Sequence, residues 1–226
     1  PALIQQRSRE TAIVPMEAFA VPEALAGATG SNRYPGQPRI QAVNDLQAIQ
    51  SWLATKSGSS NTERAYRKES ERLLLWAVIE RQKALSDLTV DDCAAYRDWL
   101  SALGRGSPEH WPFRVPESDW IGKRNTPRFS PAWRPFDGPL SAASVRQALT
   151  IVSGLFEWLV CVQYCAFNPW DAVGKKLASQ DDAPADIELT RVFSQAQWRY
   201  LTHHLDQLPR DAHSHRLHFV LPFAYA

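Results

Sequence analysis

The chain of 226 residues is long enough for one large domain, or for one domain with appendages. Its hydrophobic fraction of 44% and its nine tryptophans exclude a fully disordered polymer, because disordered chains lack the apolar groups that a core needs. The 25 basic and 24 acidic residues nearly cancel, so any nucleic-acid surface must come from local segregation of charge.

The three cysteines, Cys93, Cys161 and Cys165, are odd in number and lack the spacing of a disulfide framework, which favours a reducing compartment. Cys161 and Cys165 would lie one turn apart on a helix, but no Cys or His neighbour suggests a metal or redox site. We expect buried structural thiols. The N-terminus lacks the apolar stretch of a signal peptide, and the most apolar region, 148–162, is too short to span a bilayer. The sequence therefore predicts a cytoplasmic protein with no membrane partner.

Residues 1–42 show no sustained periodicity and are interrupted by prolines and glycines, which predicts a flexible or loosely docked arm. Apolar residues recur at helical spacing over 43–56, which predicts a first helix. The Ser/Gly stretch 57–60 then interrupts it. Thr62 is a favourable N-cap, so a second helix is expected from there to about Lys83.

The sequence Thr-Val-Asp-Asp at 89–92 fits a capping box and predicts a third helix, which Gly104 ends. The following stretch, 104–139, is called the insert and is rich in proline and in large aromatic residues. Proline at this density excludes a regular helix, because each proline removes a donor and clashes with the preceding turn. The aromatic residues argue against disorder. We therefore expect an ordered, irregular loop whose Trp and Phe side chains pack on the domain.

A fourth helix is predicted over 141–164, apolar on nearly every side after its first two turns, as a central buried helix would be. The pair Asn-Pro at 168–169 stops it. Residues 174–190 are typical of a linker. A capping box at 194–197 begins another helix. The apolar residues 219–226 carry no stop signal, so we expect the chain to be truncated there.

The helix that begins near Thr62 carries four cations on one face: Arg64, Arg67, Lys68 and Arg72. At about 100° per residue they fall within a sector of roughly 140°, opposite the apolar residues. An ordinary solvated face explains this pattern, and Glu71 within the sector favours that interpretation. The alternative is a row of cations that follows phosphates or base edges in a major groove. The free N–H groups at Asn61 and Thr62 would then meet a phosphate.

The helix from Ser141 gathers its polar residues in the first two turns, at Ser144, Arg146 and Gln147. Polar groups at one end of an otherwise buried helix indicate that this end is presented to a partner. Arg suits guanine edges and Gln suits adenine edges. Caps and solvated side chains are the simpler explanation of the same residues.

These two helices together resemble the core-binding domain of the tyrosine site-specific recombinases, the phage-integrase family. In that family one helix opens with a Thr and has a Tyr four residues later, as Thr62 and Tyr66 stand here. The last helix opens with Ser and a basic or amide residue and ends in Asn-Pro, as at 168–169. A Ser/Thr-capped helix of the catalytic domain follows, matching 191–198. The resemblance covers about 43–226, apart from the insert.

The resemblance implies an all-α fold. A four-to-five-helix core-binding (SAM-like) domain over 43–173 would be interrupted by the Pro/Trp-rich insert 104–139. The linker 174–190 would lead to the first helices of a truncated catalytic domain over 191–226. The implied function is sequence-specific binding of double-stranded DNA, for integration or site-specific recombination through a phosphotyrosine intermediate. Self-association on DNA and a place at the nucleoid follow from the same resemblance.

The residues expected to contact DNA are Asn61, Thr62, Arg64, Arg67, Lys68, Arg72, Ser144, Arg146, Gln147, Lys175 and Lys176. No metal, nucleotide or other cofactor and no small-molecule substrate is expected. No catalytic residue is assigned, because Tyr225 precedes the place of the family's first catalytic Arg. Strand transfer is therefore expected only of a longer parent protein.

Other interpretations stay open. The histidines at 203–204 and 213–218 could ligate a metal, although a polar turn separates them and a solvated helix connection is favoured. Cations of the insert could extend a DNA contact, although acidic residues accompany them and packing is favoured. Two other function classes fit the chain. One is a non-catalytic helical DNA-binding regulator, and the other is a helical protein-interaction module that uses the Trp-rich insert.

Overall fold

A computed structural model describes residues 12–56, 58, 60–105, 111–173, 194–209 and 211–225. The described residues are mostly helical, and their β structure is limited to isolated bridges, which confirms the all-α class. The chain divides into two compact units, Pro1–Leu177 and Ala178–Ala226, called unit 1 and unit 2. None of the described helices is both long enough and apolar enough to cross a membrane.

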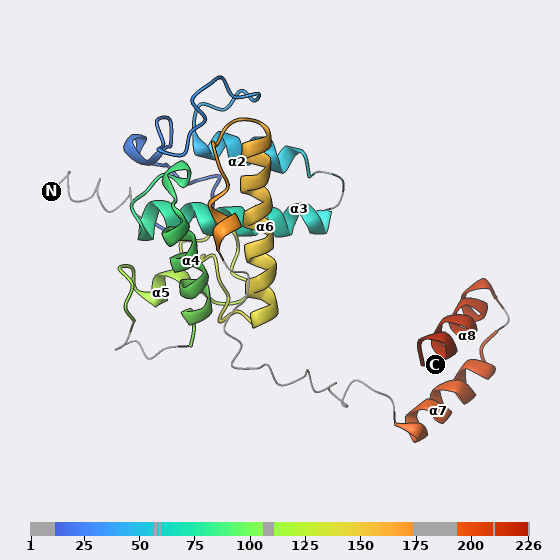
Figure 1. Ribbon diagram of the computed structural model, residues 1–226. Helices are drawn as coiled ribbons and strands as arrows, with labels where there is room; N and C mark the ends of the chain where they lie inside the picture. The colour runs from blue at the N-terminus through green and yellow to red at the C-terminus, as the bar shows by residue number, and fades with distance from the viewer. Residues whose placement is uncertain are drawn as a thin grey trace. The chain divides into compact units, whose positions relative to one another are not determined.

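Unit 1 is built on the helices α2 (Asp45–Ala54), α3 (Ser60–Leu75), α4 (Val90–Ala102) and α6 (Ala142–Cys161). They lie where the spacing of apolar residues predicted helices, and α3 crosses α6 (Figure 1). Shorter helical turns join them: Glu23–Leu25, the π-helical turn Trp76–Glu80, Leu85–Asp87, α5 (Glu117–Trp120) and Pro169–Ala172.

Side-chain caps fix several helix starts. The capping box predicted at Thr89 is present, with Asp92 N–H donating to the Thr89 hydroxyl and Thr89 N–H donating to the Asp92 carboxylate. The predicted start of α3 is wrong, because the helix begins at Ser60 and Thr62 lies inside its first turn. Ser60, Asn61 and Thr62 are all competent cap residues, so the sequence does not choose among them.

The predicted end of α6 is also too late. The helix ends at Cys161, and Gln163 adopts a left-handed conformation with φ of 56°, which stops a helix. Cys165 therefore lies beyond the helix and is buried, while Cys161 is exposed. The expectation of buried thiols at Cys161 and Cys165 is confirmed for Cys165 and wrong for Cys161, and Cys93 is also buried. Burial raises the pKa of the Cys165 thiol to about 12, so this thiol is unreactive at neutral pH.

The core is centred on Trp99 of α4, which is fully buried. Its ring packs edge-on against Trp120, at 4.9 Å between centroids, and against Phe136, at 5.6 Å. Trp120 and Phe136 belong to the insert, so the prediction that its aromatic residues pack on the domain is confirmed for both. It is wrong for Phe129, which is 71% exposed.

The first half of the insert is fixed by a carboxylate of the Trp76–Glu80 turn. Glu80 accepts the backbone N–H groups of Arg114, at 2.6 Å, and Val115, at 2.9 Å. Trp111 and Trp133 are half-buried against the core. The insert is thus an integral part of unit 1.

The N-terminal segment 12–42 also packs on unit 1, so the prediction of a flexible arm is wrong for these residues. Met16 and Phe19 are buried in the core. Ala166 N–H donates to Asn32 O at 2.8 Å, beside the bridge between Arg33 and Cys165. The segment has no helical period because its order comes from contacts with distant residues. Residues 1–11 lie outside the described part of the chain.

Unit 2 is described from Ser194 and contains α7 (Gln195–Asp206) and α8 (Ala212–Tyr225). The predicted capping box is present: Gln197 N–H donates to the Ser194 hydroxyl, and Ser194 N–H donates to the Gln197 amide oxygen. Leu205 of α7 is buried, and its carbonyl oxygen lies 3.1 Å from His218 Nε2. Within the described residues no group of three His, Cys, Asp or Glu side chains is placed to hold a metal ion.

The buried aromatic residues of the insert predict a stability test. Trp120→Ala should lower the free energy of unfolding by about 3–5 kcal/mol, because the fully buried indole leaves a cavity against Trp99. Phe129→Ala is the matched control in the same insert. Its exposed ring should make the change smaller than about 0.5 kcal/mol in urea unfolding. Equal effects of the two substitutions would contradict this description of the insert.

A second stability test concerns Asp92, which is 1% exposed and pairs with Arg81 at 2.6 Å and Lys83 at 2.7 Å. Burial raises the pKa of its carboxyl, but hydrogen bonds from Lys83, Thr89 and Arg81 outweigh burial and lower the pKa from 3.8 to about 2. A carboxyl whose pKa is depressed by folding stabilises the protein above its unfolded pKa. That stabilisation is lost as the pH falls through the folded pKa.

Asp92→Asn should therefore lower the stability at pH 7 by about 1–2 kcal/mol, a range reduced because both cationic partners are partly solvated. The loss of stability of the parent protein between pH 4 and pH 2 should become shallower in the variant. Urea unfolding across this range measures both effects, and parallel pH profiles would contradict the role of Asp92.

Candidate nucleic-acid interface

The crossing of α3 and α6 leaves a groove of about 470 Å³ at the surface of unit 1. It is lined by Asn61, Thr62, Ala65 and Tyr66 of α3 and by Gln147, Thr150 and Ile151 of α6. The groove therefore brings together residues that the sequence predicted separately on two helices. Its lining combines amide and hydroxyl groups with the apolar side chains of Ala65 and Ile151.

Exposed cations flank this groove. Arg64 and Arg146 are exposed, and within the described part of the chain no carboxylate lies within ion-pair distance of either guanidinium. Lys68 is 52% exposed, and its ammonium lies 3.2 Å from the buried carboxylate of Glu69. These three side chains present positive charge to solvent on both helices that border the groove.

Arg72 does not lie on the exposed face where the sequence predicted a DNA contact. Its side chain is 7% exposed and pairs with Glu69 at 3.0 Å. The guanidinium donates through Nε to Pro135 O at 2.9 Å and lies 4.0 Å from the Phe136 ring centroid. Arg72 therefore stabilises the interior beneath the insert and has no surface to offer a phosphate. It lies at the edge of the basic sector, and a segment more than sixty residues away in sequence covers it.

The exposure of the Arg67 side chain lies between that of the exposed Arg64 and that of the buried Arg72. Its side chain is 36% exposed and pairs with Glu63 at 2.8 Å and with Glu17 at 3.3 Å. The partner Glu17 comes from the N-terminal segment, which the sequence did not place against α3. Arg67 thus links the two segments and contributes less free charge to the surface than Arg64.

Glu71 does not dilute the basic face, although the sequence placed it there. It is 2% exposed, accepts the Met16 backbone N–H at 2.7 Å, and pairs with Arg128 of the insert. Burial raises the pKa of Glu17, which also binds Arg128, but hydrogen bonds and the positive charges of Arg128 and Arg67 together outweigh burial and lower the pKa. Both carboxylates are therefore paired with Arg128 of the same unit.

The first turns of α6 are exposed, as predicted. Ser141 is the N-cap: its hydroxyl accepts the Ser144 N–H at 3.1 Å and lies 3.0 Å from the Ser144 hydroxyl. Ser144, Arg146 and Gln147 all lie on exposed positions of this end. Lys175 and Lys176, also predicted to contact DNA, lie outside the described residues.

The sequence interpretation missed two residues at the groove. Lys56, just after α2, places its ammonium 5.6 Å from the Trp52 ring centroid and 5.5 Å from that of Tyr66. Thr150 lines the groove one turn beyond Arg146, to whose carbonyl its hydroxyl donates at 2.9 Å. Helical spacing from Gln147 could have indicated Thr150. Nothing in the local sequence indicates Lys56, since it joins the site through packing of α2 on α3.

No family model, curated protein or solved structure matches this chain in comparisons with known proteins. The interpretation of the groove as a nucleic-acid interface therefore depends on its geometry and on the charge of the residues around it.

The correction at Arg72 can be tested against its neighbour on the same helix. Arg72→Ala should lower the free energy of unfolding by about 3 kcal/mol, because it leaves the Pro135 carbonyl without its donor and the buried Glu69 carboxylate with only the solvent-exposed Lys68 as a partner. Arg64→Ala, at an exposed position, should change it by less than about 0.5 kcal/mol. Thermal or urea unfolding measures the stability of both variants. A small effect of Arg72→Ala would contradict the burial of Arg72 and would favour the original prediction that it lies on the DNA-binding face.

Proposed function

We propose that unit 1 binds double-stranded DNA through the face formed by α3 and the start of α6, as a core-binding domain of the tyrosine-recombinase type. The observation that carries the proposal is the groove itself. Amide and hydroxyl side chains of two crossing helices meet there between unpaired cations. A major groove is about 12 Å wide and accepts one helix, so the exposed first two turns of α3 fit inside it.

The side chains suit distinct parts of a duplex. Arg64 and Lys68 extend from the exposed side of α3 and suit phosphate oxygens, because their positive charge displaces condensed counterions. Gln147 lies inside the groove, where its amide suits the donor and acceptor pair of an adenine edge. Arg146 stands beside it on α6 and suits a phosphate or a guanine.

The order of the elements supports the finer assignment. The helix with Thr62 and Tyr66, the helix opened by Ser141 and the Asn168-Pro169 stop occur in unit 1 in the order that the recombinase family has. A Ser-capped helix pair follows in unit 2, as the family's catalytic domain would begin. We infer a role in DNA integration or site-specific recombination, with self-association on DNA at the nucleoid.

The protein-interaction alternative has less support. It needs the tryptophans of the insert as an exposed contact surface. Trp120 is fully buried, and Trp111 and Trp133 are half-buried against the core. A non-catalytic DNA-binding regulator would use the same face of unit 1. A covalent complex with DNA separates the two, because a recombinase forms one through its nucleophile and a non-catalytic regulator does not; the complex is expected of the longer parent protein.

The proposal predicts duplex binding that weakens with salt. Replacing Arg64 and Lys68 together with Ala should lower the affinity for duplex DNA about tenfold or more, and should reduce the slope of log affinity against log salt by about 1.8, since each phosphate contact contributes about 0.9. Alanine favours helix, so the circular dichroism of α3 should be unchanged.

The matched control is Arg39→Glu, which changes the net charge by the same two units. Arg39 is exposed and bonds to Gln163, beyond the far end of α6 from Gln147. The control should keep most of the parent salt slope in a fluorescence-anisotropy titration. Equal losses in the two variants would show a bulk charge effect and would remove the case for the α3 face.

A further inference from the structure

The middle of the insert is the most charge-segregated segment of unit 1. Between Asp119 and Asp137 the sequence has no acidic residue and four cations, Lys123, Arg124, Arg128 and Arg134. The segment 122–134 is called the insert tip. Its basic character does not show in the whole insert, because acidic residues flank it on both sides.

The base of the tip is closed and buried. Gly122 N–H donates to Phe136 O at 2.8 Å, and Phe136 N–H donates to Trp120 O at 3.2 Å. Trp120 and Phe136 then pack on Trp99 in the core. Within the tip, turns are held by Thr126 hydroxyl to Lys123 O, at 2.6 Å, and by Ser130 N–H to Pro127 O, at 3.0 Å. The tip is therefore a preorganised loop.

The four cations divide into two pairs with different surroundings. Arg128 pairs with Glu17 at 2.6 Å and with Glu71, and Arg134 donates to the carbonyl oxygens of Pro131 and Trp133. These two hold the tip in place. Lys123 and Arg124 are exposed, and no carboxylate among the described residues lies within ion-pair distance of them.

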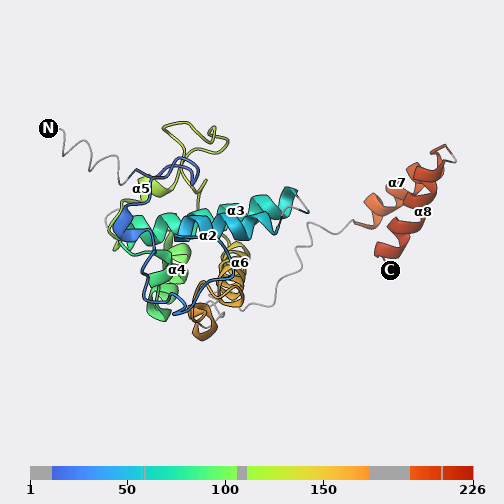
Figure 2. The ribbon, with the colours of Figure 1, turned by 90° about the horizontal axis from the view of Figure 1, so that it is seen from above.

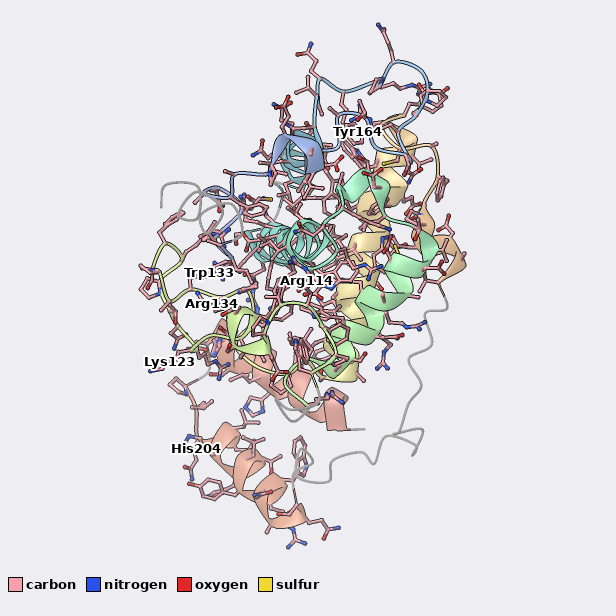
Figure 3. The ribbon with its side chains drawn as sticks, turned by 90° about the vertical axis from the view of Figure 1, so that its left-hand side faces the viewer. Arg114, Lys123, Trp133, Arg134, Tyr164 and His204 are labelled. Carbon is pink, nitrogen blue, oxygen red and sulfur yellow. The ribbon has the colours of Figure 1, made fainter. Side chains whose placement is uncertain are left out.

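The exposed side of the tip also carries an aromatic ring. Phe129 is 71% exposed, next in sequence to the anchored Arg128, so its backbone is fixed while its ring is solvated. Figure 3 shows Lys123, Trp133 and Arg134 along the same side of unit 1. Among the described residues, the side chains of Lys123, Arg124 and Phe129 make no hydrogen bond, ion pair or ring contact, so they are available to a partner.

The tip borders the exposed cations of α3. At about 100° per residue from Arg64, Glu71 lies near −20°, Lys68 near 40°, Ala65 near 100° and Tyr66 near 200°. Glu71 contacts Arg128 of the tip, and Ala65 and Tyr66 line the groove with α6. The exposed cations Arg64 and Lys68 therefore lie between the tip and the groove. In Figure 2 the insert projects on the side of α3 that faces away from α6.

We propose that the insert tip is a second duplex-DNA contact, adjacent to the face formed by α3 and α6, and this proposal rests on the function proposed above. Lys123 and Arg124 neutralise backbone phosphates next to the segment bound by α3. Phe129 packs against deoxyribose or a base edge in the neighbouring minor groove, where apolar side chains of DNA-bending proteins are placed. Because the tip is already ordered, binding loses little conformational entropy.

Four proteins test the proposal on one duplex: the parent, the tip variant Lys123→Ala/Arg124→Ala, the face variant Arg64→Ala/Lys68→Ala, and the combination of both. The tip variant should lower the affinity about tenfold and the salt slope by about 1.8, as two lost phosphate contacts require. The combination should lower the slope by about twice as much. Phe129→Ala should weaken binding a few-fold with an unchanged salt slope, because the ring displaces no counterion.

The charge-preserving variant Lys123→Arg/Arg124→Lys is the matched control and should keep the parent slope. Unfolding curves of all variants verify that the tip residues, being exposed, leave stability unchanged. An effect of the face variant with none of the tip variant overturns this inference and leaves the proposed function standing. An effect of the tip variant alone overturns the proposed face, and with it the tip as a second contact. No effect of either variant overturns both.

Discussion

The carboxylate of Glu71 organises unit 1 around α3. A buried carboxylate destabilises a fold strongly unless hydrogen bonds and an opposite charge compensate it. Here the compensation comes from Met16 N–H, in the N-terminal segment, and from the Arg128 guanidinium, in the insert. Neither segment is helical at these positions, and neither adjoins α3 in sequence. Glu71 therefore fixes both against the helix, and at the same time its negative charge is withdrawn from the exposed face.

A second buried carboxylate, that of Asp45, joins α2 to two distant parts of unit 1. Its buried carboxylate accepts the Ser86 N–H at 2.9 Å and the Tyr164 hydroxyl at 2.8 Å. Burial raises the pKa of this carboxyl against the lowering effect of those hydrogen bonds. Gly27 packs directly on it: a Cβ at Gly27 would lie 2.1 Å from Asp45 Oδ2, and its φ of 79° independently favours glycine. The N-terminal segment is thus packed at Gly27 against the buried carboxylate of Asp45.

Local signals in the sequence were sufficient to locate the helices of unit 1, although not all of their ends, and insufficient for the segments that cover them. The capping boxes at Thr89 and Ser194 could be predicted because each is complete within four residues. The groove could be predicted in part, since Thr62 and Gln147 each occupy a helix start. The burial of Arg72 could not, because its partner Pro135 is 63 residues away. A charge pattern on one helix does not reveal which distant segment will pack against it.

The positive surface of unit 1 therefore arises because folding buries acidic side chains and leaves basic side chains exposed. Along α3 the sequence mixes basic and acidic residues and has almost no net charge, as the whole chain has a formal net charge of only +1. Folding buries Glu69 and Glu71 with internal cations, whereas Arg64 and Lys68 stay in solvent. The cations of the insert are divided in the same way. Arg128 forms ion pairs with Glu71 and Glu17, whereas Lys123 and Arg124 remain unpaired among the described residues. One ion-pair network thus positions the insert and leaves its unpaired charge beside that of α3. The basic face and the stability of the fold consequently depend on the same buried carboxylate.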